Sequence, residues 1–162
     1  MKKILSASLV SLFMLFLPML SIAHDGHVVH TETGEHPVMK MASTDVVADG
    51  LVVTFMVMPN SAHKNMLKNM KMKDDIEPES THNIMVFIRD EKTGEGIAGG
   101  GVTLRVVDTD DDEQLKTGNY KRMMRTHDAY FKLAKEGKYM ITVLLDTGTQ
   151  KRAIGVSYDL SS

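Results

Sequence analysis

The sequence predicts an all-β protein, and two features of the chain support this prediction. From residue 45 onward, apolar residues recur at every second position in several short segments, as they do in strands that bury one face. Residues that favour turns, chiefly Gly and Asp, separate these segments at short intervals. About seven short strands in about 115 residues are typical of an immunoglobulin-like antiparallel β-sandwich, and we expect this fold with one short helical or loop insertion.

Six segments carry the alternation. They cover residues 51–58, 84–88, 102–106, 127–133, 139–145 and 153–160. Turns are expected between them, at residues 49–50, 92–96, 99–101 and 146–148. Each predicted strand therefore has a defined inward face, and a polar residue on that face is a candidate for a site.

Residues 61–73 interrupt the strand pattern and predict a short helix with Ser61 or Asn60 as its N-cap. At helical spacing, one face of this helix collects His63, Met66 and Met70. This face either packs on the sandwich as an apolar stripe or forms a flap that carries ligands. Both interpretations can hold if the helix covers a site.

The chain begins with an export signal. A basic start precedes an apolar stretch at residues 4–20, and small residues precede a cleavage position after Ala23. We therefore divide the chain into a signal peptide at residues 1–23, a flexible tail containing His and Met at residues 24–43, and a β-sandwich domain at residues 44–162. This organisation predicts an exported protein of the periplasm.

The composition of the exported part argues against several classes of protein. Of the 19 Lys and Arg, 17 remain once Lys2 and Lys3 are removed, against 21 Asp and Glu, whereas a nucleic-acid-binding surface would be basic. No second apolar stretch approaches the roughly 18–20 residues of a spanning helix, so no integral membrane anchor is expected. The sequence contains no Cys, so stability must come from an apolar core rather than from disulfides.

The tail offers the first candidate metal ligands. Four of the seven His lie between residues 24 and 36. Cleavage after Ala23 would expose His24, whose α-amine and imidazole can chelate one ion in the manner of the histidine brace of some copper proteins. His27 is the second candidate in this segment. His-rich tracts also occur as solvated polar tails, so this signal is compositional.

A second group of candidates lies in the domain. His82 and His127 each begin a strand and share the parity of the apolar residues that follow, so both are expected to face inward. Met123 and Met124 precede His127, and Met72 precedes His82. Imidazole suits Cu, Zn, Fe and Ni, whereas thioether narrows the choice towards Cu(I). The alternative for each His is a hydrogen bond to a loop carbonyl, and a simple up-and-down path would place the two at opposite ends of the sheet.

The stretch from residue 81 to residue 146 resembles the YtkA/FixH-like group of exported immunoglobulin-like β-sandwich domains. The residues that carry this resemblance are 81–86, 90–94, 102–104, Met123, Met124, His127 and 137–139. More distantly, the chain is similar to the P19-type periplasmic iron-uptake proteins and to CopC-like copper carriers, which bind copper through His and Met on such a sandwich. The resemblance implies that His82 and His127 approach each other in the fold.

Other patterns in the chain do not lead to a function. Residues 108–113 resemble the start of a calcium-binding loop, but Glu113 stands where such loops have Gly, so we expect a solvated turn. The glycines at residues 99–101 precede no helix and no Lys, which argues against a phosphate-binding loop. No Ser/His/Asp set, paired carboxylates or Cys nucleophile stands out, so we do not expect an enzyme.

Together these observations predict a periplasmic metal-binding protein that carries or buffers copper. The expected ligands are His82, His127, Met123, Met124 and Met72 in the domain, with His24 and His27 as an auxiliary arm. The expected cofactor is a copper ion, Cu(I) or Cu(II), with iron as the less favoured choice. The expected partner is a membrane-bound or periplasmic protein that receives the metal. The alternative is a non-catalytic periplasmic interaction module whose Met residues form an adaptable contact surface.

Overall fold

The structure of the protein, a computed structural model, describes residues 42–161. These residues form nine strands and one helix. The strands are β1 (Ala42–Ala48), β2 (Leu51–Pro59), β3 (His82–Asp90), β4 (Gly101–Val107), β5 (Glu113–Thr117), β6 (Asn119–Lys121), β7 (Thr126–Phe131), β8 (Gly137–Asp146) and β9 (Lys151–Leu160), and the helix is α1 (Asn60–Asn69). The all-β prediction with one helical insertion is confirmed. The predicted signal peptide, and the predicted tail as far as residue 41, lie outside the described residues.

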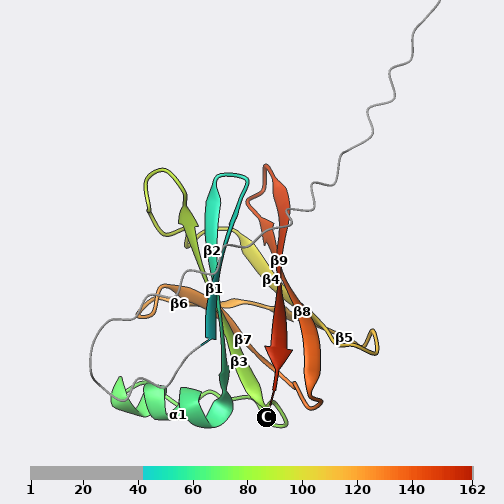
Figure 1. The fold of residues 1–162 in the computed structure, drawn as a ribbon. Coiled ribbons are helices and arrows are strands. Elements are labelled where there is room, and N and C mark those ends of the chain that lie inside the picture. Colours follow the sequence, from blue (N-terminus) through green and yellow to red (C-terminus); the bar gives the residue numbers. More distant parts are fainter. Residues whose placement is uncertain (1–41, 162) are drawn as a thin grey trace, which may run out of the picture.

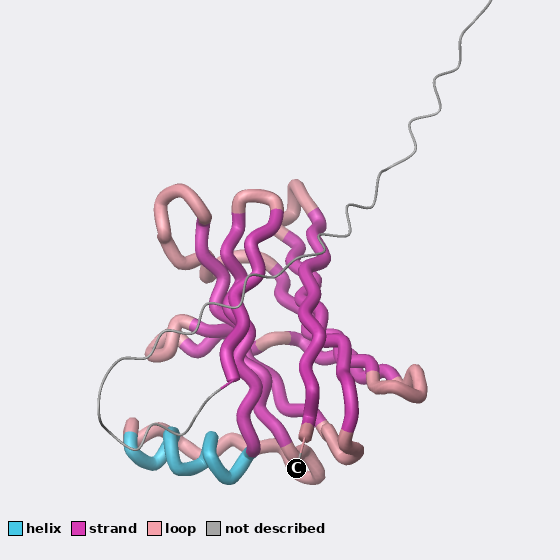
Figure 2. Tube along the Cα trace, in the orientation of Figure 1, coloured by secondary structure: helices cyan, strands magenta, loops and turns pink. Residues whose placement is uncertain are grey.

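Two antiparallel sheets face each other across one core (Figures 1 and 2). The first sheet has the order β1-β2-β3-β7-β6, and the second has the order β5-β4-β8-β9. The chain passes from the second sheet to the first at Gly118, between β5 and β6. A Cβ at Gly118 would lie 3.1 Å from Val102 Cγ1 and 3.2 Å from the Cβ of His127, so a side chain would crowd this crossing.

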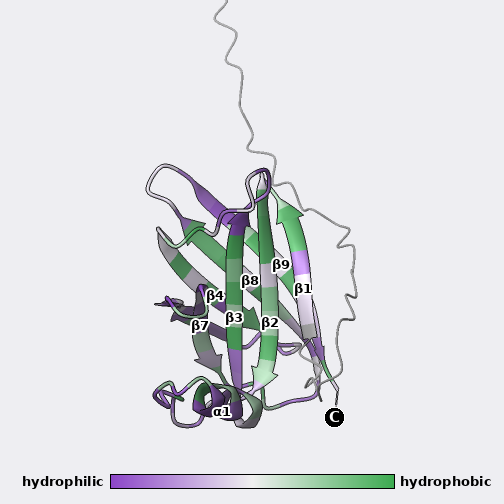
Figure 3. Ribbon diagram, turned by 90° about the vertical axis from the view of Figure 1, so that its left-hand side faces the viewer, coloured by the Kyte–Doolittle hydropathy of each residue, from purple (hydrophilic) through white to green (hydrophobic). Residues whose placement is uncertain are grey.

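The core is built from the inward positions of both sheets, as the alternation predicts. In β2 and β8 every second residue is buried, and Figure 3 shows the apolar colour running along these strands. Phe55 of β2 and Phe131 of β7 are among the largest fully buried side chains. The sequence contains no cysteine, so this apolar packing holds the two sheets together without a disulfide.

Strand β7 departs from this one-sided burial, because all six of its residues are buried. Its inner face joins the core, whereas its outer face is covered by α1 and the segment that follows the helix. His63 of α1 and Asp75 of that segment both reach the hydroxyl of Tyr130 on β7. Figure 3 shows α1 lying across the lower ends of β2, β3 and β7.

The helix is shorter than predicted and is not capped as predicted. It begins at Asn60, directly after β2, and Pro59 occupies the cap position without a side-chain hydrogen bond. The side-chain amide nitrogen of Asn60 instead donates to Ser80 Oγ at 2.8 Å, so it ties the helix to the chain before β3. The helix ends because Lys71 adopts a left-handed backbone with φ of 55°.

Two methionines within apolar strands do not fill the core. Met56 and Met140 occupy outward positions of β2 and β8, and Met140 is 47% exposed. Met85 is buried, but it also faces outward, beside Ile84 and Val86, which face the core. A strand alternates its faces whatever the hydropathy of its residues, so parity decided these positions. Within residues 42–161, no helix is long and apolar enough to span a bilayer.

Candidate metal-binding residues

His82 is the first residue of β3, where it lies on the inward face and is 8% exposed. Its Nδ1 lies 2.9 Å from the hydroxyl of the preceding residue, Thr81. Burial lowers the pKa of His82, so the ring is neutral near pH 7. One ring nitrogen of His82 therefore already has a hydrogen-bond partner, the hydroxyl of Thr81.

His127 is the second residue of β7 and is 3% exposed, also on the inward face. Neither of its ring nitrogens has a hydrogen-bond partner among the described residues. Burial lowers the pKa of His127, and the nearby backbone of Ile97 and Gly118 opposes this shift without forming a hydrogen bond of good geometry. The ring of Tyr120 covers the imidazole, with the two centroids 4.9 Å apart. His127 is thus a buried neutral imidazole with backbone polar groups nearby but no hydrogen bond of good geometry among the described residues.

The fold does not bring these two histidines together. Strands β3 and β7 are antiparallel neighbours in which His82 pairs with Phe131 and His127 pairs with Val86. The histidines are therefore four residues apart along the sheet, roughly 13 Å at the usual rise of a strand, and Ile84 lies between them on the same face. The approach that the family resemblance implied is wrong here, because both residues stand at the start of strands that run in opposite directions.

The predicted methionines divide between two places. Met123 and Met124 lie in the turn between β6 and β7, where Met123 is 68% exposed and Met124 is half-buried. This turn is closed by the amide of Met124, which donates to the carbonyl of Lys121 at 3.1 Å. Met72 is half-buried just beyond α1, where its amide donates to Leu67 at 2.9 Å. Met123 and Met124 therefore stay close to His127 along the chain, whereas Met72 belongs to the helical segment.

Two further predictions concern the tail. His24 and His27 lie outside the described residues, so their role stays a prediction. Within residues 42–161, no three side chains of His, Cys, Asp or Glu lie close enough together to hold a metal ion.

Sequence reasoning missed a group of four residues on the outer face of the first sheet, which we name the helix-covered cluster. It consists of His63, Asp75, Lys121 and Tyr130. The hydroxyl of Tyr130 lies 2.7 Å from Asp75 Oδ1 and 3.0 Å from His63 Nε2, and Asp75 forms an ion pair with Lys121. The helical spacing had placed His63 on a face with Met66 and Met70, but its partner Tyr130 is 67 residues away in the chain.

A second buried polar pair lies on the same outer face. The side-chain amide nitrogen of Asn83 donates to Asp128 Oδ2 at 3.3 Å, while Asn83 Oδ1 and Asp128 Oδ1 have no partner among residues 42–161. Burial raises the pKa of Asp128 to about 6, against the opposing effects of Lys121 and Asn83. The position of Asp128 follows from parity, because the neighbouring His127 faces inward.

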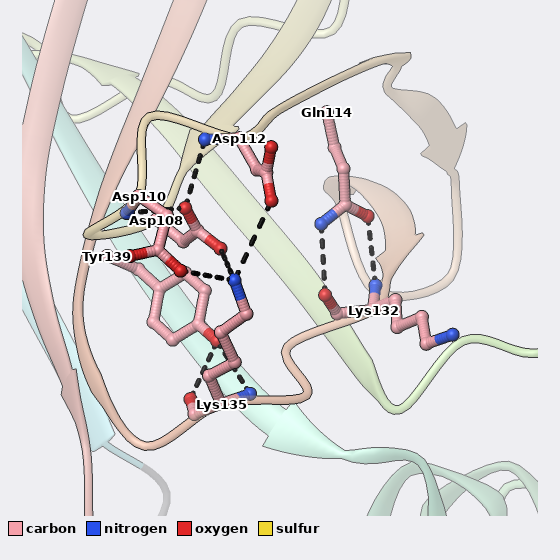
Figure 4. A network of polar contacts seen from close by, with 7 residues as sticks. All are labelled: Asp108, Asp110, Asp112, Gln114, Lys132, Lys135 and Tyr139. Carbon is pink, nitrogen blue, oxygen red and sulfur yellow. Dashed lines mark hydrogen bonds and ion pairs between the residues drawn. The ribbon is translucent and has the colours of Figure 1, made fainter.

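The acidic turn before β5 is organised around a lysine rather than left open. The Lys135 ammonium contacts the carboxylates of Asp108, Asp110 and Asp112, and the hydroxyl of Tyr139 donates to the Lys135 carbonyl at 2.7 Å (Figure 4). Asp108 also accepts the amides of Asp110 and Asp112. The space between these carboxylates thus holds a cation of the protein itself.

The exposed methionines do not form a common surface. Among residues 43–161, the exposed ones are Met123 and Met140. Met123 lies at the β6–β7 turn of the first sheet, and Met140 lies on β8 of the second sheet. The described methionines therefore give no support to a single Met-rich docking patch.

No protein-family model and no curated protein matches this chain. Its fold is similar to that of FetP from uropathogenic Escherichia coli strain F11, with a TM-score of 0.56 at 12% identity over 74% of this chain and 94% of FetP. A copper-bound variant of FetP gives 0.54 at 12% identity, over 74% and 95%. A DUF4426 family protein from Pseudomonas aeruginosa PAO1 gives 0.53 at 11% identity, over 73% and 94%.

These likenesses establish the fold. The resemblance found in the sequence is supported as far as this β-sandwich, and the YtkA/FixH-like group itself finds no support in them. The chain is similar in architecture to FetP and to the DUF4426 family protein.

Proposed function

We propose that this protein binds copper in the periplasm, as a carrier or a buffer, and that His127 is the central ligand in its domain. The buried state of His127 carries this proposal. A neutral imidazole has one N–H and one bare lone pair, and a buried polar group without a partner costs about 1–3 kcal/mol. Native proteins rarely leave such a group unused, and a bound metal ion would give the lone pair a partner.

The surroundings of His127 favour a soft, monovalent ion. Met123 and Met124 belong to the turn that ends directly before β7, four and three residues before His127 along the chain. Imidazole with thioether favours Cu(I). Arg125 follows them, and its guanidinium lies beside Gly96 and Phe87.

The structural likeness to FetP suggests copper as the metal to test. A copper-bound variant of FetP has the same architecture, and copper in that protein makes copper the first metal to test here. At 12% identity the likeness carries no ligand from one protein to the other. The domain ligands of this proposal are therefore His127, Met123 and Met124, whereas His82 and Met72 are left out because the fold places them elsewhere.

The remaining parts of the proposal rest on the sequence. An export signal would deliver the chain to the periplasm, and His24 and His27 would form an auxiliary arm that captures the ion. A membrane-bound or periplasmic protein would receive the metal. This role needs no catalysis, so we propose that the protein is not an enzyme.

The test compares two buried histidines that differ in their partners. We expect His127→Gln to weaken Cu(I) binding by the exported chain about tenfold or more, because it removes the unpartnered imidazole. His82→Gln is the matched control and should change the affinity less than about twofold. The measurement is competition with a chromophoric Cu(I) chelator, in chains that also carry His24→Ala and His27→Ala. Equal affinities for the His127 and His82 variants, with both folded by circular dichroism, would overturn the proposal.

A further inference from the structure

The helix-covered cluster determines which nitrogen of His63 carries the proton. A tyrosine hydroxyl has one proton, and the carboxylate of Asp75 can only accept, so Tyr130 donates across the 2.7 Å contact to Asp75. The oxygen of Tyr130 is then the acceptor in its 3.0 Å contact with His63 Nε2. His63 therefore carries its proton on Nε2.

This arrangement leaves the other nitrogen of His63 with a bare lone pair. His63 is fully buried, and its Nδ1 has no hydrogen-bond partner among the described residues. Burial lowers the pKa of His63, although Asp75 opposes the shift, so the ring is neutral near pH 7. Histidines that bind metal through one nitrogen usually donate the other N–H to a fixed acceptor, which orients the ring. Tyr130, held by Asp75, fulfils that second role here.

The sheet beneath the helix supplies buried thioethers. Met58 and Met85 both face outward, and they are 3% and 1% exposed. Met58 pairs with Asn83, which pairs in turn with Tyr130, so these three residues form one row across β2, β3 and β7. That row spans two interstrand spacings, roughly 10 Å, and α1 packs across it against β2 and β3.

The helix adds two more thioethers on the same side. Met66 and Met70 follow His63 at helical spacing, and both are half-buried. The carboxylate of Asp75 is already occupied by Tyr130 and Lys121, whereas Asn83 Oδ1 and Asp128 Oδ1 on the same face have no partner among the described residues. Imidazole together with thioethers favours Cu(I), whereas Mg²⁺ and Ca²⁺ need several oxygen ligands.

We infer that α1 covers a second Cu(I) site, in which His63 Nδ1 is the nitrogen ligand and Met58 and Met85 are the principal sulfur ligands. This site lies on the outer face of the first sheet, whereas His127 faces inward, so the two are separate. Asp75 and Tyr130 act as positioning residues, because they hold the tautomer of His63 without touching the ion. The inference shares with the proposed function only the choice of copper.

The test removes the other sites first. A chain with His24→Ala, His27→Ala and His127→Gln is titrated with Cu(I), and its copper is examined by X-ray absorption. We expect one equivalent to remain, with both nitrogen and sulfur in its coordination shell. Adding His63→Gln should abolish this equivalent. The replacements Met58→Leu and Met85→Leu conserve volume and so preserve packing, and they should remove sulfur scattering and weaken binding about tenfold or more.

Further variants separate a ligand role from a structural one. Tyr130→Phe removes the acceptor that fixes the tautomer of His63, so it should weaken Cu(I) binding while the sulfur ligands persist. Met140→Leu, at an exposed position of the other sheet, is the control and should change nothing. The inference is overturned if the starting variant binds no Cu(I), or if both Met→Leu replacements leave the affinity and the sulfur signal unchanged. A chain with only His63→Gln, which keeps His127, reports separately on the proposed function.

Discussion

Adjacent residues of β7 serve opposite sides of the first sheet. His127 points into the core, and Asp128 points to the covered outer face, because successive side chains of a strand alternate. Each has a polar atom without a partner among residues 42–161. The free energy cost of these atoms differs, since a neutral imidazole is cheaper to bury than a carboxylate that ionises. Asp128 is therefore the residue whose replacement should stabilise the fold.

We predict that Asp128→Asn stabilises the protein at pH 7.5. Burial raises the pKa of Asp128 from 3.8 to about 6, so the folded state binds the proton more tightly than the unfolded state. Ionisation then costs stability as the pH rises through this interval, and the full cost is present above it. Removing the charge should raise the free energy of unfolding by about 1–3 kcal/mol at pH 7.5, and by much less at pH 4. Urea denaturation at both pH values measures this, with the exposed Asp111→Asn as control; a loss of stability at pH 7.5 would contradict it.

At the scale of single elements, the turn before β5 shows how a run of acidic residues is kept in place. Asp108 caps the turn by accepting two backbone amides, and Asp111 adopts a left-handed backbone with φ of 63°. Lys135, on the segment before β8, neutralises the carboxylates that the turn brings together. The segments before β5 and β8 are thus joined by charge at one edge of the second sheet.

We predict that Lys135→Met lowers the thermal midpoint and flattens its dependence on pH. Burial acts to raise the pKa of Asp108. The amides of Asp112 and Asp110 and the Lys135 ammonium outweigh burial and together lower this pKa. Because its pKa is lowered, the Asp108 carboxylate contributes stability that is fully present above its ordinary pKa of 3.8. This contribution is lost as the pH falls through the lowered pKa. Thermal midpoints between pH 7 and pH 2.5 test this, with Lys138→Met as the control. A variant that follows the parent curve would show that the contact contributes nothing.

At the scale of the whole molecule, two sheets share one apolar core that must supply the stability of a chain without disulfides. Phe131 lies at the centre of this arrangement, because it is fully buried on β7 and packs in the same cluster as residues of β4 and β8. The same strand also carries Asp128 and Tyr130, which face outward and belong to the two buried polar groups. Core packing and the candidate sites therefore depend on the same strand.

We predict that Phe131→Ala lowers the free energy of unfolding by about 3–5 kcal/mol, through lost burial and the cavity that remains. Leu115→Ala, at a position that is 57% exposed on β5, should change it by less than about 0.5 kcal/mol. Urea denaturation of both variants, read by circular dichroism, is the measurement. Similar values for the two would mean that the two sheets do not share the cooperative core seen in the structure.

The sequence by itself determined the strands that have a strong apolar face, and which side of each of these strands is buried. The inward positions of β2, β4 and β8 follow from their alternation, and so do those of His82 and His127. These are local properties, because the pleat assigns each residue to a face whatever its partner strand. Residues 42–48 and the short strands β5 and β6 were not singled out, since they lack a strong apolar face.

Only the tertiary structure decided which side chains meet. The register of β3 against β7 separates His82 from His127, and the packing of α1 joins His63 to Tyr130 across 67 residues of chain. Register and packing depend on partners distant in sequence and on the turns that bring them back, so no local pattern encodes them. For that reason the predicted donors, imidazole and thioether, were identified from the sequence, whereas the places where they gather came from the fold.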